Sequence, residues 1–351
     1  MKFLPKCILG ILGLLAVGLD QRAAAAPSVC YGLTPLPGLS VDDDGASINN
    51  RGQVASGGVR WYRGHRRTLS VPLPHSPPES AQAHGINEAG TVVGEASGSA
   101  DGAWLVNYGQ AIVWHSAKGQ GLPVRVSMST VANAINNAGV VVGTAYEPMP
   151  DQDQSIYEAF LLRHGRTVFL RARKAIGINN RGQILVQSGF SRMSLSSYVP
   201  AHFLLLSHGK RVQIKDARTG AGLDDAVAMN DAGVVVGSIG NTACLWRQGH
   251  VTKLGRLSGE QVDPAAINNR EQIVGKAEIE PLKPLEQYDS PETHAFLWQH
   301  GRMTDLNHLL ARKSGWVLYE ADAINDRGQI VCWGSKGACL LTPMPITAKR
   351  R

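Results

Sequence analysis

The chain has 351 residues, of which 43% are hydrophobic and 18% are charged, and its formal net charge is +7. No run of five or six like charges occurs and no basic stripe alternates with aromatic residues, which argues against a nucleic-acid partner. No segment reaches the roughly 18 uninterrupted apolar residues that a membrane span needs, so we expect no transmembrane segment in the mature chain.

The N-terminus has the pattern of a secretory signal. Lys2 and Lys6 are followed by the apolar stretch Cys7–Leu19 and by the small residues Ala23–Ala26. We therefore predict that residues 1–26 are a signal peptide and that the protein is exported, to the periplasm or outside the cell. Removal of this segment lowers the net charge to about +5.

A short phrase then returns seven times: Ile or Met, Asn, two variable positions, Gly and an apolar run. A phrase that recurs roughly every 40 to 50 residues indicates a repeat architecture. The copies begin at Ile48, Ile86, Ile135, Ile178, Met229, Ile267 and Ile324.

Each phrase predicts a β-hairpin with a tight turn, because Asn favours the first turn position and Gly accepts the left-handed conformation. These residues are interpreted as structural, not catalytic: Asn49, Gly52, Asn87, Gly90, Asn136, Gly139, Asn179, Gly182, Asn230, Gly233, Asn268, Asn325 and Gly328. The sixth copy has Glu271 in place of Gly, which predicts a turn that is either strained by about 1 kcal/mol or differently shaped.

A second hairpin follows each phrase, most fully as HAFLWQHGRMTDL from His294. Alternation places Phe296 with Trp298, and Ile112 with Trp114, on one face, so these residues are expected in the core. Two hairpins give four antiparallel strands per repeat, which is one blade of a β-propeller.

The two ends of the chain predict a closed ring. The last repeat ends with its third strand, from Gly337, and Val29–Ser40 resembles a fourth strand without a predecessor. We predict an all-β, seven-bladed propeller in one domain, residues 28–345, with a basic tail over residues 346–351. An open solenoid would need capping repeats, which the sequence lacks.

The repeats resemble a known family. His294, Ala295 and Phe296, followed by Leu297 and Trp298, and then the phrase of Ile324, are similar to the HAF repeat of exported bacterial proteins. The resemblance extends from about Val29 to Thr342. It implies a propeller-like repeat and brings no catalytic residues with it.

Four cysteines follow the signal segment. Cys244 and Cys339 occupy a slot that is Phe in other repeats, which predicts buried apolar residues. Cys339 can also be paired with Cys332 across a short hairpin or with Cys30 across the closing blade. Cys30–Cys339 is the preferred disulfide candidate because it would join the two ends of the ring. No Cys/His spacing suggests a metal site, and no cofactor is predicted.

The repeats differ most between their second and third strands. Long connections occur at Glu95–Gly109, Thr144–Tyr157, Ser188–Pro200 and Lys276–Thr293, and equivalent connections are expected on one face of a propeller. Because aromatic residues on loops of a rigid scaffold are typical of recognition surfaces, they are the candidate ligand-binding residues. These are Trp104, Tyr108, Tyr146, Tyr157, Tyr198 and Tyr288.

The sequence thus favours an exported, monomeric, non-enzymatic binding module whose long-loop face contacts a saccharide or a protein. One alternative is an extracellular polysaccharide hydrolase or lyase that uses carboxylates of the long loops. Another is a structural cell-surface repeat protein.

Overall fold

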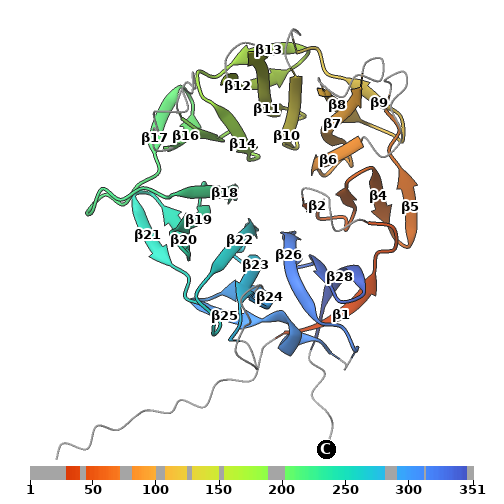
Figure 1. Ribbon diagram of the computed structural model, residues 1–351, viewed down its shortest axis with the longest axis vertical. Coiled ribbons are helices and arrows are strands. Elements are labelled where there is room, and N and C mark those ends of the chain that lie inside the picture. The colour runs from red at the N-terminus through yellow and green to blue at the C-terminus, as the bar shows by residue number, and fades with distance from the viewer. Residues whose placement is uncertain are drawn as a thin grey trace, which may run out of the picture.

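The computed structural model describes residues 29–39, 45–71, 81–99, 107–124, 129–149, 154–188, 202–280, 291–311 and 314–345. Seven four-stranded antiparallel sheets are arranged radially around a central channel (Figure 1). The predicted seven-bladed propeller is confirmed. The predicted signal peptide and basic tail lie outside the described residues, within which no helix is long and apolar enough to cross a membrane.

Each blade is formed by four consecutive strands, except the last. From the channel outward, blade 1 contains β2 (Ala46–Ile48), β3 (Val54–Ser56), β4 (Val59–Tyr62) and β5 (His65–Thr68), and blade 2 contains β6 (Ala81–Ile86), β7 (Val92–Ser99), β8 (Asn107–Trp114) and β9 (Gly119–Gly121). Blade 3 contains β10 (Ser129–Ile135), β11 (Val141–Met149), β12 (Gln154–Arg163) and β13 (Arg166–Phe169). Blade 4 contains β14 (Lys174–Ile178), β15 (Ile184–Gln187), β16 (Phe203–Ser207) and β17 (Lys210–Gln213). Blade 5 contains β18 (Asp225–Met229), β19 (Val235–Ile239), β20 (Thr242–Arg247) and β21 (His250–Lys253). Blade 6 contains β22 (Val262–Ile267), β23 (Ile273–Glu278), β24 (Thr293–Gln299) and β25 (Arg302–Asp305). Blade 7 contains β26 (Leu318–Ile324), β27 (Ile330–Gly334), β28 (Gly337–Met344) and, as its outermost strand, β1 (Cys30–Pro35). A short 3-10 helix, η2 (Leu306–Leu309), follows β25.

The first strand of the described residues closes the ring, as predicted. β1 pairs antiparallel with β28, with Leu33 opposite Leu341, and so forms the outermost strand of blade 7. Tyr31 on β1 is only 1% exposed and packs in a core cluster with Leu318 and Ile330. This pairing hides the open edge that an unclosed array of blades would present to solvent.

The core lies between neighbouring blades. Phe160 of blade 3 packs with Val93 of blade 2, and Phe296 of blade 6 packs with Val236 of blade 5. Both Phe side chains are fully buried, which confirms the prediction for Phe296, whereas Trp298 is only partly buried. Each blade therefore buries an apolar face on both sides, and the hydrophobic effect holds the ring together at every junction.

The innermost strands carry a recurrent β-bulge. In six blades the register shifts at the residue two positions before the Ile or Met of the phrase. The bulge brings the innermost backbone close to the second strand, where a Cβ on Gly237 would lie 1.9 Å from the carbonyl oxygen of Asp225. Gly94, Gly143, Gly237 and Gly275, which end four copies of the phrase, leave room for this close approach.

The antiparallel order defines two ends of the ring. The phrase turns, between the first and second strands, lie at the same end as the turns between the third and outermost strands, and we call this end the turn face. The connections between second and third strands, and those between blades, lie at the opposite end, the loop face.

Two of the predicted long connections are partly strand. The β7–β8 ladder continues to the pair Ser99 and Asn107, and the β11–β12 ladder continues to Met149 and Gln154. Backbone hydrogen bonding therefore carries these hairpins well into segments that we predicted to be loops.

The candidate disulfide between Cys30 and Cys339 is wrong. The register places Cys30 opposite Met344 and Cys339 opposite Pro35, and all described cysteines are free. Five residues of extended strand separate the two sulfurs by about 17 Å, which exceeds the reach of a disulfide. Cys332 does lie opposite Cys339, as the short-hairpin alternative requires.

Candidate functional site

The turn face is built from the seven phrase turns. The side-chain oxygen of Asn49 accepts hydrogen bonds from the backbone N–H groups of Arg51, at 3.1 Å, and Gln53, at 3.0 Å. Gly52 completes the turn with a φ of 77°, and Glu271 adopts the same conformation in the sixth copy with a φ of 58°. The predicted structural Asn and Gly residues all lie in turns of this kind, so the sixth turn keeps its shape and carries the strain.

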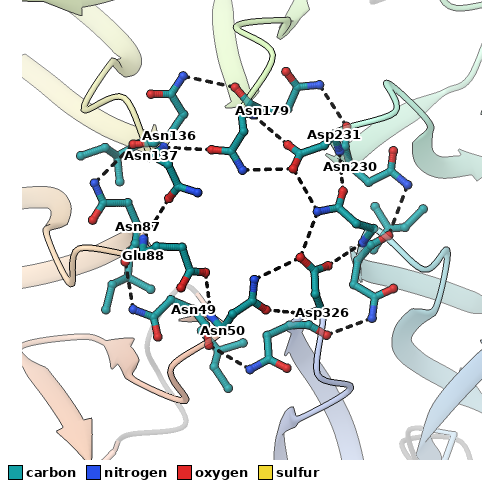
Figure 2. A pocket seen from close by; sticks show the side chains of 18 of the residues that line it. Asn49, Asn50, Asn87, Glu88, Asn136, Asn137, Asn179, Asn230, Asp231 and Asp326 are labelled. Carbon is teal, nitrogen blue, oxygen red and sulfur yellow. Dashed lines mark hydrogen bonds between the residues drawn. The ribbon is translucent and has the colours of Figure 1, made fainter.

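The same Asn residues also join the blades. The Asn49 amide donates to the backbone carbonyl of Asn87 in the next blade, and Asn325 of blade 7 donates to Asn49 of blade 1. All seven amides repeat this contact at 2.9 to 3.3 Å and so form a closed ring around the channel mouth (Figure 2). The sequence interpretation missed this inter-blade role.

A second ring lies beside the first. Its members are the residues that follow each turn Asn: Asn50, Glu88, Asn137, Asn180, Asp231, Asn269 and Asp326. Each side chain accepts a hydrogen bond from the backbone N–H of its counterpart in the preceding blade, at 2.7 to 2.9 Å. The Asn269 amide further donates to the carboxylates of Asp231 and Asp326, each at 3.0 Å.

The two rings enclose a polar mouth of about 200 Å³. The donors and acceptors that line the mouth are largely hydrogen-bonded to one another, so their main role is structural: they hold the seven blades in register. Among the described residues, no group of three or more His, Cys, Asp or Glu side chains is arranged to hold a metal ion.

A larger cavity, of about 600 Å³, lies toward the loop face. The innermost strands of blades 2 to 5 supply most of its wall, and β7, β11 and β12 supply the remainder. It is lined by His84, Glu95, Val131, Asn133, Thr144, Tyr146, Tyr157, Lys174, Ile176 and Val227. His84, Asn133, Ile176 and Val227 all occupy the bulged position of their strands.

Two of the predicted ligand-binding residues meet in this cavity. Tyr146 and Tyr157 are opposite each other on β11 and β12, and their ring centroids are 6.0 Å apart with an interplanar angle of 26°. The guanidinium of Arg173 lies 5.0 Å from the centre of the Tyr157 ring, within cation–π range. These contacts hold the aromatic pair in place on the cavity wall.

The other predicted ligand-binding residues are not brought to this cavity by the described structure. Tyr108 lies on β8 with its backbone opposite Gly98. Trp104, Tyr198 and Tyr288 lie outside the described residues.

Polar groups surround the tyrosine pair. The Asn133 amide donates to the hydroxyl of Thr144 at 3.1 Å and to the backbone carbonyl of Ala175. The Nε2 atom of His84 lies 3.9 Å from a carboxylate oxygen of Glu95. The cavity thus combines an aromatic surface with an amide, a hydroxyl, an imidazole and a carboxylate, the mixture that small polar ligands need. His84 and Asn133 share a place in the repeat, two positions before the Ile of the phrase, but only the structure shows that this position is a bulge that faces the cavity.

A partly buried carboxylate, Asp322, occupies the bulged position of blade 7. Burial raises the pKa of Asp322 to about 6, although the indole N–H of Trp333 donates a hydrogen bond to it and partly opposes the shift. Nearby, the ammonium of Lys276 contacts Glu320 at 3.3 Å across the junction of blades 6 and 7. Asp322 does not line the larger cavity, so we treat it as a determinant of stability.

No protein-family model and no curated protein matches this sequence. Among solved structures, an orthorhombic form of the Pyrococcus horikoshii acylaminoacyl peptidase is similar, with a TM-score of 0.50 and 10% identity over 87% of this chain and 52% of that chain. YCF48 bound to a D1 peptide has a TM-score of 0.48 and 10% identity, over 89% and 96% of the two chains. The propeller domain of the trilobed protease from Pyrococcus furiosus has a TM-score of 0.42 and 12% identity, over 76% and 85%.

This chain spans about half the length of the acylaminoacyl peptidase structures that it matches. At 10% identity the likeness concerns the fold alone.

Proposed function

We propose that this protein is an exported, non-enzymatic binding module and that a saccharide occupies its loop-face cavity. The observation that carries the proposal is the stacked pair of Tyr146 and Tyr157 in the wall of the 600 Å³ cavity. Flat aromatic faces pack against the C–H faces of sugar rings, while neighbouring polar groups bond the hydroxyls. A volume of about 300 to 1,000 Å³ is typical of small-molecule sites.

The rigidity of the scaffold supports this assignment. The cavity wall consists of paired strands, and the tyrosines are fixed by each other and by Arg173. A site that is formed before the ligand arrives loses little conformational entropy on binding. Mobile loops are therefore not needed to assemble it.

Export and membership of the HAF-repeat family remain part of the proposal. The segment over residues 1–26 has the signal pattern, and the residues that give the family its name have a structural explanation. His294 contacts the carboxylate of Asp305 through Nδ1 at 2.7 Å, while Ala295 and Phe296 are fully buried. The motif thus supports the blade, which agrees with a family defined by its repeat.

The hydrolase or lyase alternative needs carboxylates that act together. Glycoside hydrolysis generally uses a pair of carboxyl groups about 5 or 9 Å apart. Glu95 is the one carboxylate among the described residues that line the cavity. The binding function is therefore the better supported of the two.

Binding to a panel of bacterial and host polysaccharides tests the proposal, with wild type compared with Tyr146→Ala and Tyr157→Ala. Each variant should lose retention of the same glycan. Tyr319→Ala is the matched control, because this exposed tyrosine on β26 does not line the cavity. A protein ligand, or no ligand at all, would contradict the saccharide assignment, and glycan turnover that Glu95→Gln abolishes would favour the enzyme.

A further inference from the structure

Blade 1 departs from the other blades at one interior position. Arg60 on β4 directly precedes Trp61, which lies opposite Val54 on β3. The register identifies the equivalent third-strand residue in every other blade, and each is aliphatic. These residues are Val113, Leu161, Leu205, Leu245, Leu297 and Leu340.

Arg60 lies on the side of blade 1 that faces blade 2. It is opposite Ala55, which packs with Trp114 of blade 2 in the core between the two blades. Its guanidinium donates to the backbone carbonyl of Gly90, in the phrase turn of blade 2, at 2.9 Å. A charged side chain thus lies at the interface between blades 1 and 2, at a position where every other blade has an aliphatic residue.

A second arginine lies directly opposite the first. Arg67 on β5 pairs in register with Arg60, and its equivalents in blades 5 and 6 are Thr252 and Thr304. Cross-strand partners have Cβ atoms about 5 Å apart, and like charges at that distance destabilise a sheet. Burial and the charge of Arg67 both lower the pKa of Arg60.

No carboxylate within the described ranges forms an ion pair with either arginine. Arg60 is partly exposed and Arg67 is exposed, so solvent reaches the pair. Further hydrogen-bond donors share the same sheet face, because Tyr62 and His65 form the next cross-strand pair. The guanidinium of Arg63 lies 5.1 Å from the Tyr62 ring.

We infer that Arg60 and Arg67 form a binding site for the oxyanion group, phosphate or sulfate, of an anionic ligand. Two guanidinium groups on neighbouring strands can each donate to one tetrahedral oxyanion, and the bound anion would offset their mutual repulsion. The site lies at the edge between blades 1 and 2, near the turn face. It is separate from the loop-face cavity and does not depend on the proposed saccharide function.

The charge of the turn face favours anion capture. Its phrase turns expose Arg51, Arg181, Arg270 and Arg327. The turns between third and outermost strands add Arg63, Arg163, Arg166, Lys210, Arg247 and Arg302. The carboxylates of this face, Glu88, Asp231, Glu271 and Asp326, are fewer. An excess of positive charge raises the local concentration of anions and speeds their association.

The test uses Arg60→Leu, which restores the residue type found in the other blades and should therefore fold. Calorimetric titration of wild type with inorganic phosphate and with sodium sulfate, at ionic strength held constant with chloride, should detect binding of at least one anion. Arg60→Leu should weaken this binding at least tenfold, and Arg67→Thr should have the same effect. Arg302→Leu, which removes an exposed arginine from blade 6, should bind as wild type does.

Polymeric probes distinguish the source of the oxyanion. Chondroitin sulfate supplies sulfate esters and inorganic polyphosphate supplies phosphate, and the polymer that binds wild type should be weakened by Arg60→Leu and not by Arg302→Leu. The inference is overturned if wild type binds neither anion, or if Arg60→Leu and Arg302→Leu lose affinity equally. The latter result would mean that net charge, and not this pair, attracts anions.

Discussion

The turn face and the loop face are opposite ends of the same seven repeats, yet they are organised differently. At the turn face all blades present the same Asn turn, and the side chains bond one another in two closed rings (Figure 2). At the loop face the blades differ in hairpin length, and Tyr146, Tyr157 and Lys174 line a cavity. Repetition therefore serves closure of the ring, and ligand recognition is expected where the repeats diverge.

Charge separates the two faces as well. The turn face presents far more Arg and Lys side chains than carboxylates, and one of those carboxylates, Glu271, is paired with Arg247. In the described part of the loop face, Asp224, Glu260 and Glu280 are interspersed with cations such as Arg256. Electrostatic attraction would thus draw a polyanion to the turn face and not to the loop face.

Loss of one ring asparagine should have the largest effect on stability. Asn230 is 4% exposed, donates to the carbonyl of Asn268 at 3.2 Å, and accepts from the N–H groups of Ala232 and Val234. Asn230→Ala leaves these buried groups unpaired and should lower the free energy of unfolding by about 3 kcal/mol in chemical denaturation. Asn241→Ala, at an exposed turn of the loop face, should change it by less than about 0.5 kcal/mol. Equal effects would contradict the structural role of the turn face.

Removal of the partly buried carboxylate of Asp322 in blade 7 should stabilise the protein. The pKa of Asp322 is raised from 3.8 to about 6 in the folded state, so the native protein binds the extra proton between these values. The contribution of Asp322 to the free energy of unfolding is therefore greatest below pH 4, where the carboxyl is protonated in both states, and it is lost as the pH rises through 6. Asp322→Asn keeps an acceptor for Trp333 and should raise the free energy of unfolding at pH 7.5 by about 1 to 2 kcal/mol, with little gain at pH 4. The same gain at both pH values would show that the pKa is not the cause.

Backbone conformation can be tested at the turn face without a change in packing. A Cβ on Gly182 meets no atom within 4 Å, but the residue has a φ of 74°. Gly182→Ala should therefore cost about 1 kcal/mol of unfolding free energy. Gly177→Ala, on the channel wall of the same blade, also meets no atom and has no positive φ, so it should be neutral or slightly stabilising. Thermal unfolding of both variants measures the difference.

The smallest effect is expected at the irregular sixth turn. Glu271→Gly removes the strain of a φ of 58° but also the exposed ion pair with Arg247. Since such a pair contributes little, a net gain of about 0.5 kcal/mol is expected in urea denaturation. Arg247→Gln is the control that removes the ion pair alone, and a loss with Glu271→Gly would show that the pair outweighs the strain.

The sequence predicts the fold because every repeat contains its own turn and strand signals. Asn49 and Gly52 identify a turn locally, but the bond from Asn49 to Asn87 exists only when seven blades close the ring. The sequence did not predict the position of Cys30, which lies opposite Met344 and not opposite Cys339. The strand register in the closing blade depends on packing between strands, which comparison of the repeats does not reveal.

The site is predictable only in part, for a related reason. Tyr146 and Tyr157 are visible as aromatic residues of a long connection, and their meeting depends on the extended β11–β12 ladder. His84 and Asn133 enter the cavity through bulges, which have no strong local sequence signal. Arg60 becomes notable only when the strand registers align it with the aliphatic residues of the other blades.

The most direct test of the central claim is the dissociation constant of the retained glycan, measured calorimetrically for wild type and for the double variant Tyr146→Ala, Tyr157→Ala. Loss of two aromatic contacts should weaken binding by about tenfold or more, with a small change in unfolding midpoint. Unchanged affinity in the folded double variant would contradict the assignment of ligand recognition to the loop face.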